Sequence, residues 1–452
     1  MSTYESIEYS PILSNPSQIF RNVCESNEPK KIGVEFEILP VSGDTFLAAD
    51  YFGQDGIEGA LEDFSNALGW RPLYENGHII ALKDNDRALS LEPGGQLELS
   101  SKPYTNLLDI ENEFRYFLSI IIPILQKRNI FALGMGLQPF SDIDSVKIVP
   151  KTRYKIMDNY LSKRGKLARY MMRLSAGIQC NFDYRSEEEA EKIYKTSLVV
   201  SPLITAITAN SPLYQGNLTF YHSYRSLIWL DTDPDRCGVL SEWFNSRFTF
   251  ESYIEYVMNI PVFFIVRNNE WIHPDRITFR EFYAKGYGGY VATEADWNLH
   301  LTTIFNEIRF KPIFEVRGND ALPYKYSLSI PALWKGILYD ISAQNAVQDL
   351  LVFKNKDALL KFHNDIIRDS LDAKLNNHKA IDLAKEILDI ARNGLINQKS
   401  LDRTLPDEAK YLQPLEEILK NKSSPAKTFI TKFRTGEKTL NELISESIFG
   451  VL

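Results

Sequence analysis

Residues 33–39 read GVEFEIL, and this stretch decides the fold that the sequence predicts. Polar and apolar side chains alternate in it, and residues two apart in a β-strand point to the same face. Glu35 and Glu37 therefore share one face, while Val34 and Phe36 lie on the opposite face, towards the core. We expect a half-buried strand that carries two carboxylates on its outer face.

Three later segments alternate in the same way: GGQLELS (94–100), GIQCNFDY (177–184) and NEIRFKPIFEVRG (306–318). The polar residues that share faces there are Glu98; Gln179, Asn181 and Asp183; Glu307, Arg309 and Lys311; and Glu315 and Arg317. Taken singly, each strand is compatible with an outer face that is merely solvated. Residues 306–318 alternate like a pair of strands, so glutamate, which is uncommon in strands, recurs in four strands and favours a functional face.

If these strands are neighbours, their carboxylates repel one another by about 4 kcal/mol per pair at an effective dielectric constant of about 20. A cation must offset this repulsion, and the candidates are Arg309, Lys311 and Arg317 or a divalent metal ion. Carboxylate and amide oxygens favour a hard cation such as Mg²⁺ or Mn²⁺ over Zn²⁺. The pattern therefore predicts a site for magnesium and a nucleotide, with the three cationic side chains on the nucleotide.

The remaining periodicity predicts an α+β fold. Residues 57–68 and 107–126 show helical spacing, and the chain from about residue 333 to its end is almost entirely helical. Residues 185–212 predict a pair of helices with a break near Ser201 and Pro202. No linker separates these parts, so we expect a single catalytic domain over residues 1–452, in which residues 333–452 form a mainly helical subregion.

Composition excludes several classes of protein. The chain has 452 residues, 44% of them hydrophobic, and 51 Lys and Arg against 59 Asp and Glu, a net charge of −8. This balance is globular and argues against a nucleic-acid partner. No apolar run reaches the ~18 residues of a membrane span. The absence of a secretory signal pattern and the three cysteines, Cys24, Cys180 and Cys237, favour a reducing, cytoplasmic location.

Common nucleotide and hydrolase motifs are missing. The sequence contains no G-x-x-x-x-G-K-[ST], no G-x-S-x-G and no H-E-x-x-H. Cys180 lies on the apolar side of its strand, which indicates a buried filler and not a nucleophile.

Nine segments in order resemble the plant-type glutamate–cysteine ligase family. They are GVEFEIL, SLEPGGQLELSS, RYKIMDNYL, MMRLSAGIQCNFDY, TANSP, YRSLIWLDTDPDRCG, TFREFYAKG, DWNLHLTTIFNEIRFKPIFEVRG and IPALWKGILYD. AKEILDIARNGL resembles the closing helix of the family. The resemblance implies a fold like that of glutamine synthetase, in which a curved, mostly antiparallel sheet forms a funnel surrounded by helices.

The resemblance also implies roles for individual residues. Metal ligands would be Glu35, Glu37, Glu98, Gln179 and Glu315. Arg317 would face the transferred phosphoryl group, and Arg225 would hold the α-carboxylate of substrate glutamate. Tyr221 and Trp229 would help to form the substrate pocket. For Glu92, the alternatives of a ligand and a turn-stabilising role stay open.

The activity implied is ATP-dependent joining of the γ-carboxylate of L-glutamate to the amine of L-cysteine through a γ-glutamyl phosphate, the first step towards glutathione. A different amine acceptor and a non-catalytic relative are the alternatives. Two departures from the family pattern stand out: Arg173 is shifted by one position, and the regulatory cysteines of the plant enzymes have no counterparts. The oligomeric state is not defined by the sequence.

Overall fold

A nine-stranded antiparallel sheet organises the computed structural model, which describes residues 10–450. The strand order is β14-β15-β7-β1-β5-β4-β3-β2, and β6 pairs with the second half of β1. The bounds are β1 (Ile32–Ser42), β2 (Arg71–Glu75), β3 (His78–Asp84), β4 (Arg87–Leu91), β5 (Leu97–Ser100), β6 (Ile130–Leu133), β7 (Gly177–Phe182), β14 (Ile308–Phe310) and β15 (Phe314–Asp320). The end strands β14 and β2 do not pair, so the sheet is not closed into a barrel, and the predicted α+β fold is confirmed.

One face of the sheet is the apolar face predicted from GVEFEIL. Val34, Phe36 and Ile38 are each at most 2% exposed. The ring of Phe36 stacks on Phe114 of helix α3 (Leu107–Gln126), with the ring centroids 3.9 Å apart. Helix α3 therefore covers this face, and the polar side chains of β1 point the other way.

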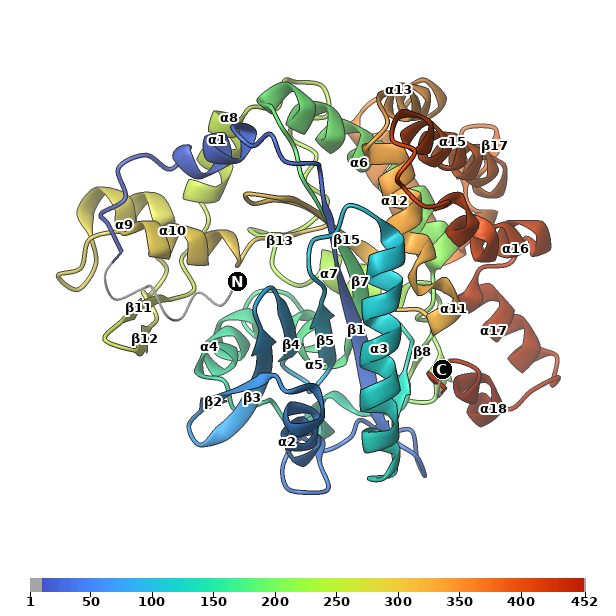
Figure 1. Cartoon of the computed structure of the whole chain (residues 1–452), viewed down its shortest axis with the longest axis horizontal. Coiled ribbons are helices and arrows are strands. Elements are labelled where there is room, and N and C mark those ends of the chain that lie inside the picture. The colour runs from blue at the N-terminus through green and yellow to red at the C-terminus, as the bar shows by residue number, and fades with distance from the viewer. Residues whose placement is uncertain (1–9, 451–452) are drawn as a thin grey trace.

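The other helices surround the sheet. Figure 1 shows α11 to α18 gathered along one side of the molecule and α8 to α10 on the opposite side. Their bounds are α1 (Gln18–Cys24), α2 (Ile57–Leu68), α4 (Thr152–Leu161), α5 (Ala168–Leu174), α6 (Glu187–Thr208), α7 (Tyr224–Leu230), α8 (Phe250–Met258), α9 (Phe279–Lys285), α10 (Glu294–Leu301), α11 (Tyr324–Ser327), α12 (Ser329–Leu338), α13 (Ile341–Leu350), α14 (Lys356–Asp369), α15 (Ala380–Leu401), α16 (Gln413–Asn421), α17 (Pro425–Arg434) and α18 (Leu440–Ser445).

The predicted break at Pro202 is wrong, because α6 runs without interruption from Glu187 to Thr208. A proline inside a helix costs about 3 kcal/mol. Every residue from Val200 to Thr208 is buried, however, and each large apolar side chain among them contributes about 1.5–3 kcal/mol. Tertiary packing therefore outweighs the local penalty.

Four short strand pairs were not predicted from the sequence. They are β8 (Leu213–Tyr214) with β9 (Asn217–Leu218), β10 (Cys237–Gly238) with β13 (Phe305–Asn306), β11 (Ile265–Arg267) with β12 (Glu270–Ile272), and β16 (Lys374–Leu375) with β17 (His378–Lys379). The last pair interrupts the helical region. One buried hydrophobic cluster includes side chains from Leu13 to Phe449, and the single domain over residues 1–452 stays a prediction. Within residues 10–450, no helix has the length and apolar character to cross a membrane.

Candidate active site

The carboxylates predicted to share a face come together at the centre of the sheet. Glu37 of β1 lies directly opposite Glu98 of β5, and Glu35 lies opposite Gln179 of β7. Further along the same sheet, Glu315 of β15 pairs with the strand β7. The period-two pattern therefore predicted which face of the sheet these side chains share and that they are neighbours on it.

A cavity of about 740 Å³ lies on this polar face. Its walls include Leu73 of β2 and Arg309 of β14, which belong to the two end strands, so the sheet curves around the cavity. The predicted site residues that line it are Glu35, Glu37, Glu98, Gln179, Trp229, Arg309, Lys311 and Arg317. Cavities of ~300–1,000 Å³ are typical of small-molecule sites.

Burial and mutual repulsion perturb the carboxylates that line the cavity. Burial raises the pKa of Glu37 to about 7; nearby Glu92 adds to the rise, and the cations of Arg225 and Arg317 oppose it. Burial also holds the pKa of Glu98 well above its usual range, and Glu35, Glu92 and Glu37 add to the effect. These carboxylates therefore lack sufficient positive charge within the chain.

Glu315 has the opposite environment. It is completely buried, and its carboxylate pairs with Arg309 at 2.7 Å, Lys311 at 2.5 Å and Arg317. Burial alone would raise the pKa of Glu315, but the three cations outweigh it and hold the pKa well below the ordinary value. In this structure Glu315 organises the cationic side of the cavity.

Gln179 joins the two sides. Its Nε2 donates a hydrogen bond to Glu37 Oε1 at 2.8 Å, and its Oε1 accepts one from Arg317. The amide therefore fixes the position of Arg317 relative to the carboxylates.

Two arginines flank the ring of Trp229. The guanidinium carbon of Arg317 lies 5.4 Å from the ring centroid, and that of Arg225 lies 5.9 Å from it. Arg225, on α7, is 2% exposed and donates from Nη2 to the main-chain oxygen of Arg317 at 3.2 Å. A Cβ atom at Gly177 would come within 2.4 Å of that Nη2, so only glycine leaves room for this approach.

Comparison with known proteins identifies the family. Residues 31–446 match the family described as glutamate-cysteine ligase family 2 (GCS2). The chain belongs to the glutamate–cysteine ligase family 2. It is 32% identical over 430 residues to glutamate–cysteine ligase B, chloroplastic, of Oryza sativa subsp. japonica, which covers 94% of this chain and 85% of that protein. It is 32% identical over 413 residues to the chloroplastic glutamate–cysteine ligase of Arabidopsis thaliana, which covers 91% of this chain and 77% of the relative.

A solved structure shares the fold. The crystal structure of glutamate–cysteine ligase from Francisella tularensis in complex with AMP superimposes with a TM-score of 0.58 at 12% identity, and covers 93% of this chain and 87% of the other. The predicted sheet surrounded by helices is thus the fold of this ligase as well.

The structure does not place every predicted site residue at the large cavity. A second, small cavity of about 20 Å³ lies beside Arg225. Tyr221 lines neither this cavity nor the large one, and its ring stacks on Tyr224 with the centroids 5.8 Å apart. Its role in substrate binding stays a prediction. Glu92 lines the large cavity, and its main-chain groups also close a turn with Gly95 and Gln96, so both roles considered for it remain.

Arg173, which is shifted by one position from the family pattern, lies in the last turn of helix α5 and not in a strand. Its guanidinium donates to the main-chain oxygens of Ile143 and Val146 and to Asp158. This buried arginine ties α5 to the neighbouring loop and helix, which is a structural role.

Sequence reasoning missed Lys151, a buried side chain that lines the large cavity. Its Nζ donates to the main-chain oxygen of Leu91 at 2.7 Å. Burial lowers the pKa of Lys151 to about 8, while Glu92 and Glu98 oppose the fall. No motif in its sequence neighbourhood distinguishes it from an ordinary surface lysine.

Within residues 10–450, no three His, Cys, Asp or Glu side chains are gathered in a metal-binding arrangement. Each predicted carboxylate ligand has a protein partner instead: Glu35 accepts from Asn181, Glu37 from Gln179 and Gly177, and Glu98 from Ser90. The donor chemistry fits a hard cation, because three oxygen ligands face one cavity and lack compensating charge. Each of these three carboxylates keeps a lone pair for an ion after these hydrogen bonds, because each carboxylate oxygen accepts two.

Proposed function

We propose that this protein is an ATP-dependent glutamate–cysteine ligase, which forms γ-glutamylcysteine, ADP and phosphate. One observation carries the proposal. A single cavity is lined by several carboxylates whose negative charge is not balanced within the chain, and also by Arg309, Lys311 and Arg317. Membership of the glutamate–cysteine ligase family 2 over residues 31–446 supports it. The names of the rice and Arabidopsis relatives carry the same activity.

The reaction needs activation, because a carboxylate is a poor electrophile. An oxygen of the γ-carboxylate of glutamate attacks the γ-phosphorus of ATP, and the bond from that phosphorus to the β–γ bridging oxygen breaks to release ADP. The amine of cysteine then attacks the γ-carbonyl carbon, loses a proton, and displaces phosphate together with the former carboxylate oxygen. Such a transfer depends mainly on positioning and on neutralisation of charge.

Arg317 and Arg225 serve the two ends of the glutamate. Arg317 stabilises negative charge on the transferred phosphoryl group, and Gln179 and Glu315 hold its guanidinium in place. The planar fork of Arg225 suits a carboxylate, and its main-chain link to Arg317 fixes the spacing of the two groups. Both guanidinium groups lie against the ring of Trp229.

We propose Mg²⁺ as the metal, with Mn²⁺ as a substitute. Glu35, Glu37 and Glu98 would hold it, and Gln179 and Glu315 would join only if their present hydrogen bonds and ion pairs opened. A bound divalent cation supplies charge neutralisation at the phosphates of ATP. The cytoplasm stays the compartment proposed from the sequence; the three cysteines are free thiols, and the names of the plant relatives place those proteins in chloroplasts.

The direct test is incubation of the purified protein with ATP, Mg²⁺ and L-glutamate, with L-cysteine or another amine added in turn. We expect phosphate release that requires glutamate and is fastest with cysteine. A faster reaction with a different amine would establish the alternative acceptor, and no release with any amine would contradict the proposal.

A further inference from the structure

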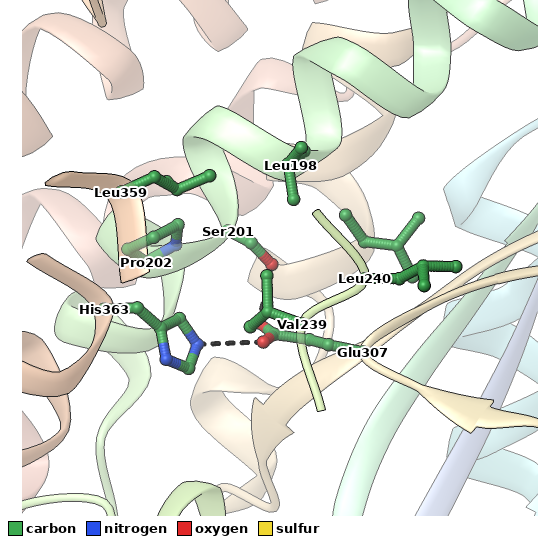
Figure 2. A pocket seen from close by; sticks show the side chains of 9 residues that line it. Leu198, Ser201, Pro202, Val239, Leu240, Glu307, Leu359 and His363 are labelled. Carbon is green, nitrogen blue, oxygen red and sulfur yellow. Dashed lines mark hydrogen bonds and ion pairs between the residues drawn. The ribbon is translucent and has the colours of Figure 1, made fainter. Parts of the chain in front are cut away.

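A half-buried carboxylate shares a small cavity with Arg225 and Arg317, outside the large cavity. Glu307 joins β13 to β14, and its Oε1 accepts a hydrogen bond from Ser201 Oγ of α6 at 2.7 Å. Its Oε2 lies 2.8 Å from Nε2 of His363 on α14. Figure 2 shows His363 and Ser201 directed at this carboxylate from two separate helices. Three elements that are distant in sequence therefore fix one acidic side chain.

Glu307 separates two small cavities. One, of about 10 Å³, is walled mainly by apolar side chains such as Leu198, Pro202 and Leu359 (Figure 2). The other, of about 20 Å³, is lined by Arg225, Trp229 and other residues of the catalytic region. The apolar side lowers the local dielectric constant, so the charge of Glu307 acts more strongly on the polar side.

The polar cavity contains groups of both signs. Within the described residues, Nε of Arg225 and Nε1 of Trp229 are buried and have no hydrogen-bond partner. The carboxylate of Glu307 lines the same space, where Gly318 leaves room for it: a Cβ atom there would come within 2.3 Å of Glu307 Oε1. Two N–H donors and one carboxylate complement the carboxylate and ammonium groups of an amino acid.

The charge of Glu307 is maintained despite burial. Burial alone would raise its pKa, but His363, the Ser201 hydroxyl and Arg225 outweigh that effect and lower the pKa below the ordinary value. Both of its oxygens keep a free lone pair after the bonds to Ser201 and His363, because each carboxylate oxygen accepts two hydrogen bonds.

The size of the cavity restricts what it can receive. About 10–15 Å³ of such space holds one water-sized group, so 20 Å³ admits a group the size of an ammonium and not a nucleotide base. The cavity shares Trp229, Phe305 and Arg317 with the large cavity. An amino acid in the large cavity can therefore direct its ammonium group into the small space while its side chain extends towards the carboxylate face.

We propose that Glu307, held by Ser201 and His363, binds the α-ammonium group of the amino-acid substrate whose α-carboxylate Arg225 binds. This inference rests on the proposed function and deepens it, because it assigns a second residue that recognises the substrate. Glu307 makes the site selective for an α-amino acid over a dicarboxylate of the same length.

The test compares L-glutamate with glutarate, which has both carboxylates but no α-ammonium group. In the wild-type protein and in Glu307→Gln we would measure the KM for glutamate and the inhibition constant of glutarate against it. A hydrogen bond between charged groups predicts that Glu307→Gln raises the KM for glutamate by about 10-fold or more. The inhibition constant of glutarate should change less than about 3-fold, because no ammonium contact is lost.

Controls make the result decisive. Glu113→Gln removes a buried carboxylate on α3 and should leave both constants unchanged. If Glu307→Gln does not fold, as judged by circular dichroism, His363→Gln and Ser201→Ala loosen the carboxylate without removing its charge, and should raise the glutamate constant alone. An equal loss for both compounds, or for neither, would overturn the inference. Absence of ATP-dependent ligation by the wild-type protein would instead contradict the proposed function.

Discussion

Arg225 donates a hydrogen bond from Nη2 to the main-chain oxygen of Arg317, 3.2 Å away. In the proposed function, Arg225 would hold the α-carboxylate of glutamate and Arg317 would face the phosphoryl group, so this bond would couple recognition to chemistry. Arg317 lies in the middle of β15 and Arg225 in the first turn of α7, so these two elements set the distance between the two groups.

Arg225→Lys keeps the positive charge and loses the planar fork. We expect the KM for glutamate to rise about 10- to 100-fold while the KM for ATP stays within about 3-fold, because the lost contacts are charge-assisted hydrogen bonds to one substrate. Steady-state kinetics with each substrate varied in turn provide the measurement. Arg128→Lys is the control. Arg128 forms an ion pair with Asp63 and lines neither the large nor the small cavity, so this change should alter neither constant. A rise in the KM for ATP alone would show that Arg225 serves the nucleotide.

Glu35→Gln and Glu315→Gln should have different effects, because Glu35 is a proposed metal ligand and Glu315 is the shared counter-ion of three cations. Glu35 is partly exposed and accepts one hydrogen bond, from Asn181, so its replacement should cost at most about 1 kcal/mol of unfolding free energy. Turnover should fall about 100-fold or more through loss of a metal ligand. Urea denaturation and turnover at saturating Mg²⁺ give the two readings, and near-normal turnover of Glu35→Gln would exclude the role.

Glu315→Gln should behave differently, because it leaves the buried Arg309 and the half-buried Lys311 and Arg317 without their counter-ion. Removal of one partner from a buried ion pair costs about 3–5 kcal/mol. We therefore expect a loss of stability of this size in urea denaturation, in addition to lost activity. A Glu315→Gln variant as stable as the wild type would contradict the role of Glu315 as the shared counter-ion of these three cations.

His300 predicts a pH dependence of stability away from the site. This buried side chain contacts the main-chain oxygen of Val257 through Nε2, and its Nδ1 has no hydrogen-bond partner among residues 10–450. Burial lowers the pKa of His300 to about 3, and Arg236 adds to the fall. The unfolded chain, with a histidine pKa of ~6.5, therefore binds a proton between about pH 6.5 and 3 that the folded protein does not.

The contribution of His300 to stability is accordingly full above about pH 6.5 and falls as the pH drops, by up to about 1.4 kcal/mol per pH unit. Denaturation of the wild type and of His300→Gln at pH 7, 6 and 5 measures the slope, which should be smaller in the variant. His378→Gln, which alters an exposed histidine, should keep the wild-type slope. Equal slopes in all three proteins would refute this assignment.

The cysteines predict the absence of a redox switch. Cys180 is completely buried on the apolar face of β7, and burial raises the pKa of all three thiols, so little reactive thiolate forms. Activity and mass should be the same after dithiothreitol or mild oxidant, provided that substrate cysteine is kept reduced. A reversible, several-fold change in activity that Cys24→Ser abolishes would contradict this expectation.

The sequence predicted the sheet face well, because a period of two fixes which side chains share a face. Glu35, Glu37 and Glu98 lie where GVEFEIL and GGQLELS placed them. The break at Pro202 was wrong because tertiary burial outweighs a local penalty. The Glu307–His363 contact joins residues 56 positions apart on different elements, and no periodicity reports such a pairing.

The fate of a labelled oxygen shows whether the γ-carboxylate of glutamate is phosphorylated. If the γ-carboxylate of glutamate is phosphorylated, one of its oxygens must leave with the phosphate when the amine of cysteine attacks. L-Glutamate carrying ¹⁸O in its γ-carboxylate would be turned over with ATP, Mg²⁺ and L-cysteine, and the phosphate and peptide products analysed by mass spectrometry. The account predicts one ¹⁸O in each phosphate released and γ-glutamylcysteine in equal amount. Phosphate without the label, or ATP consumption without the dipeptide, would contradict it.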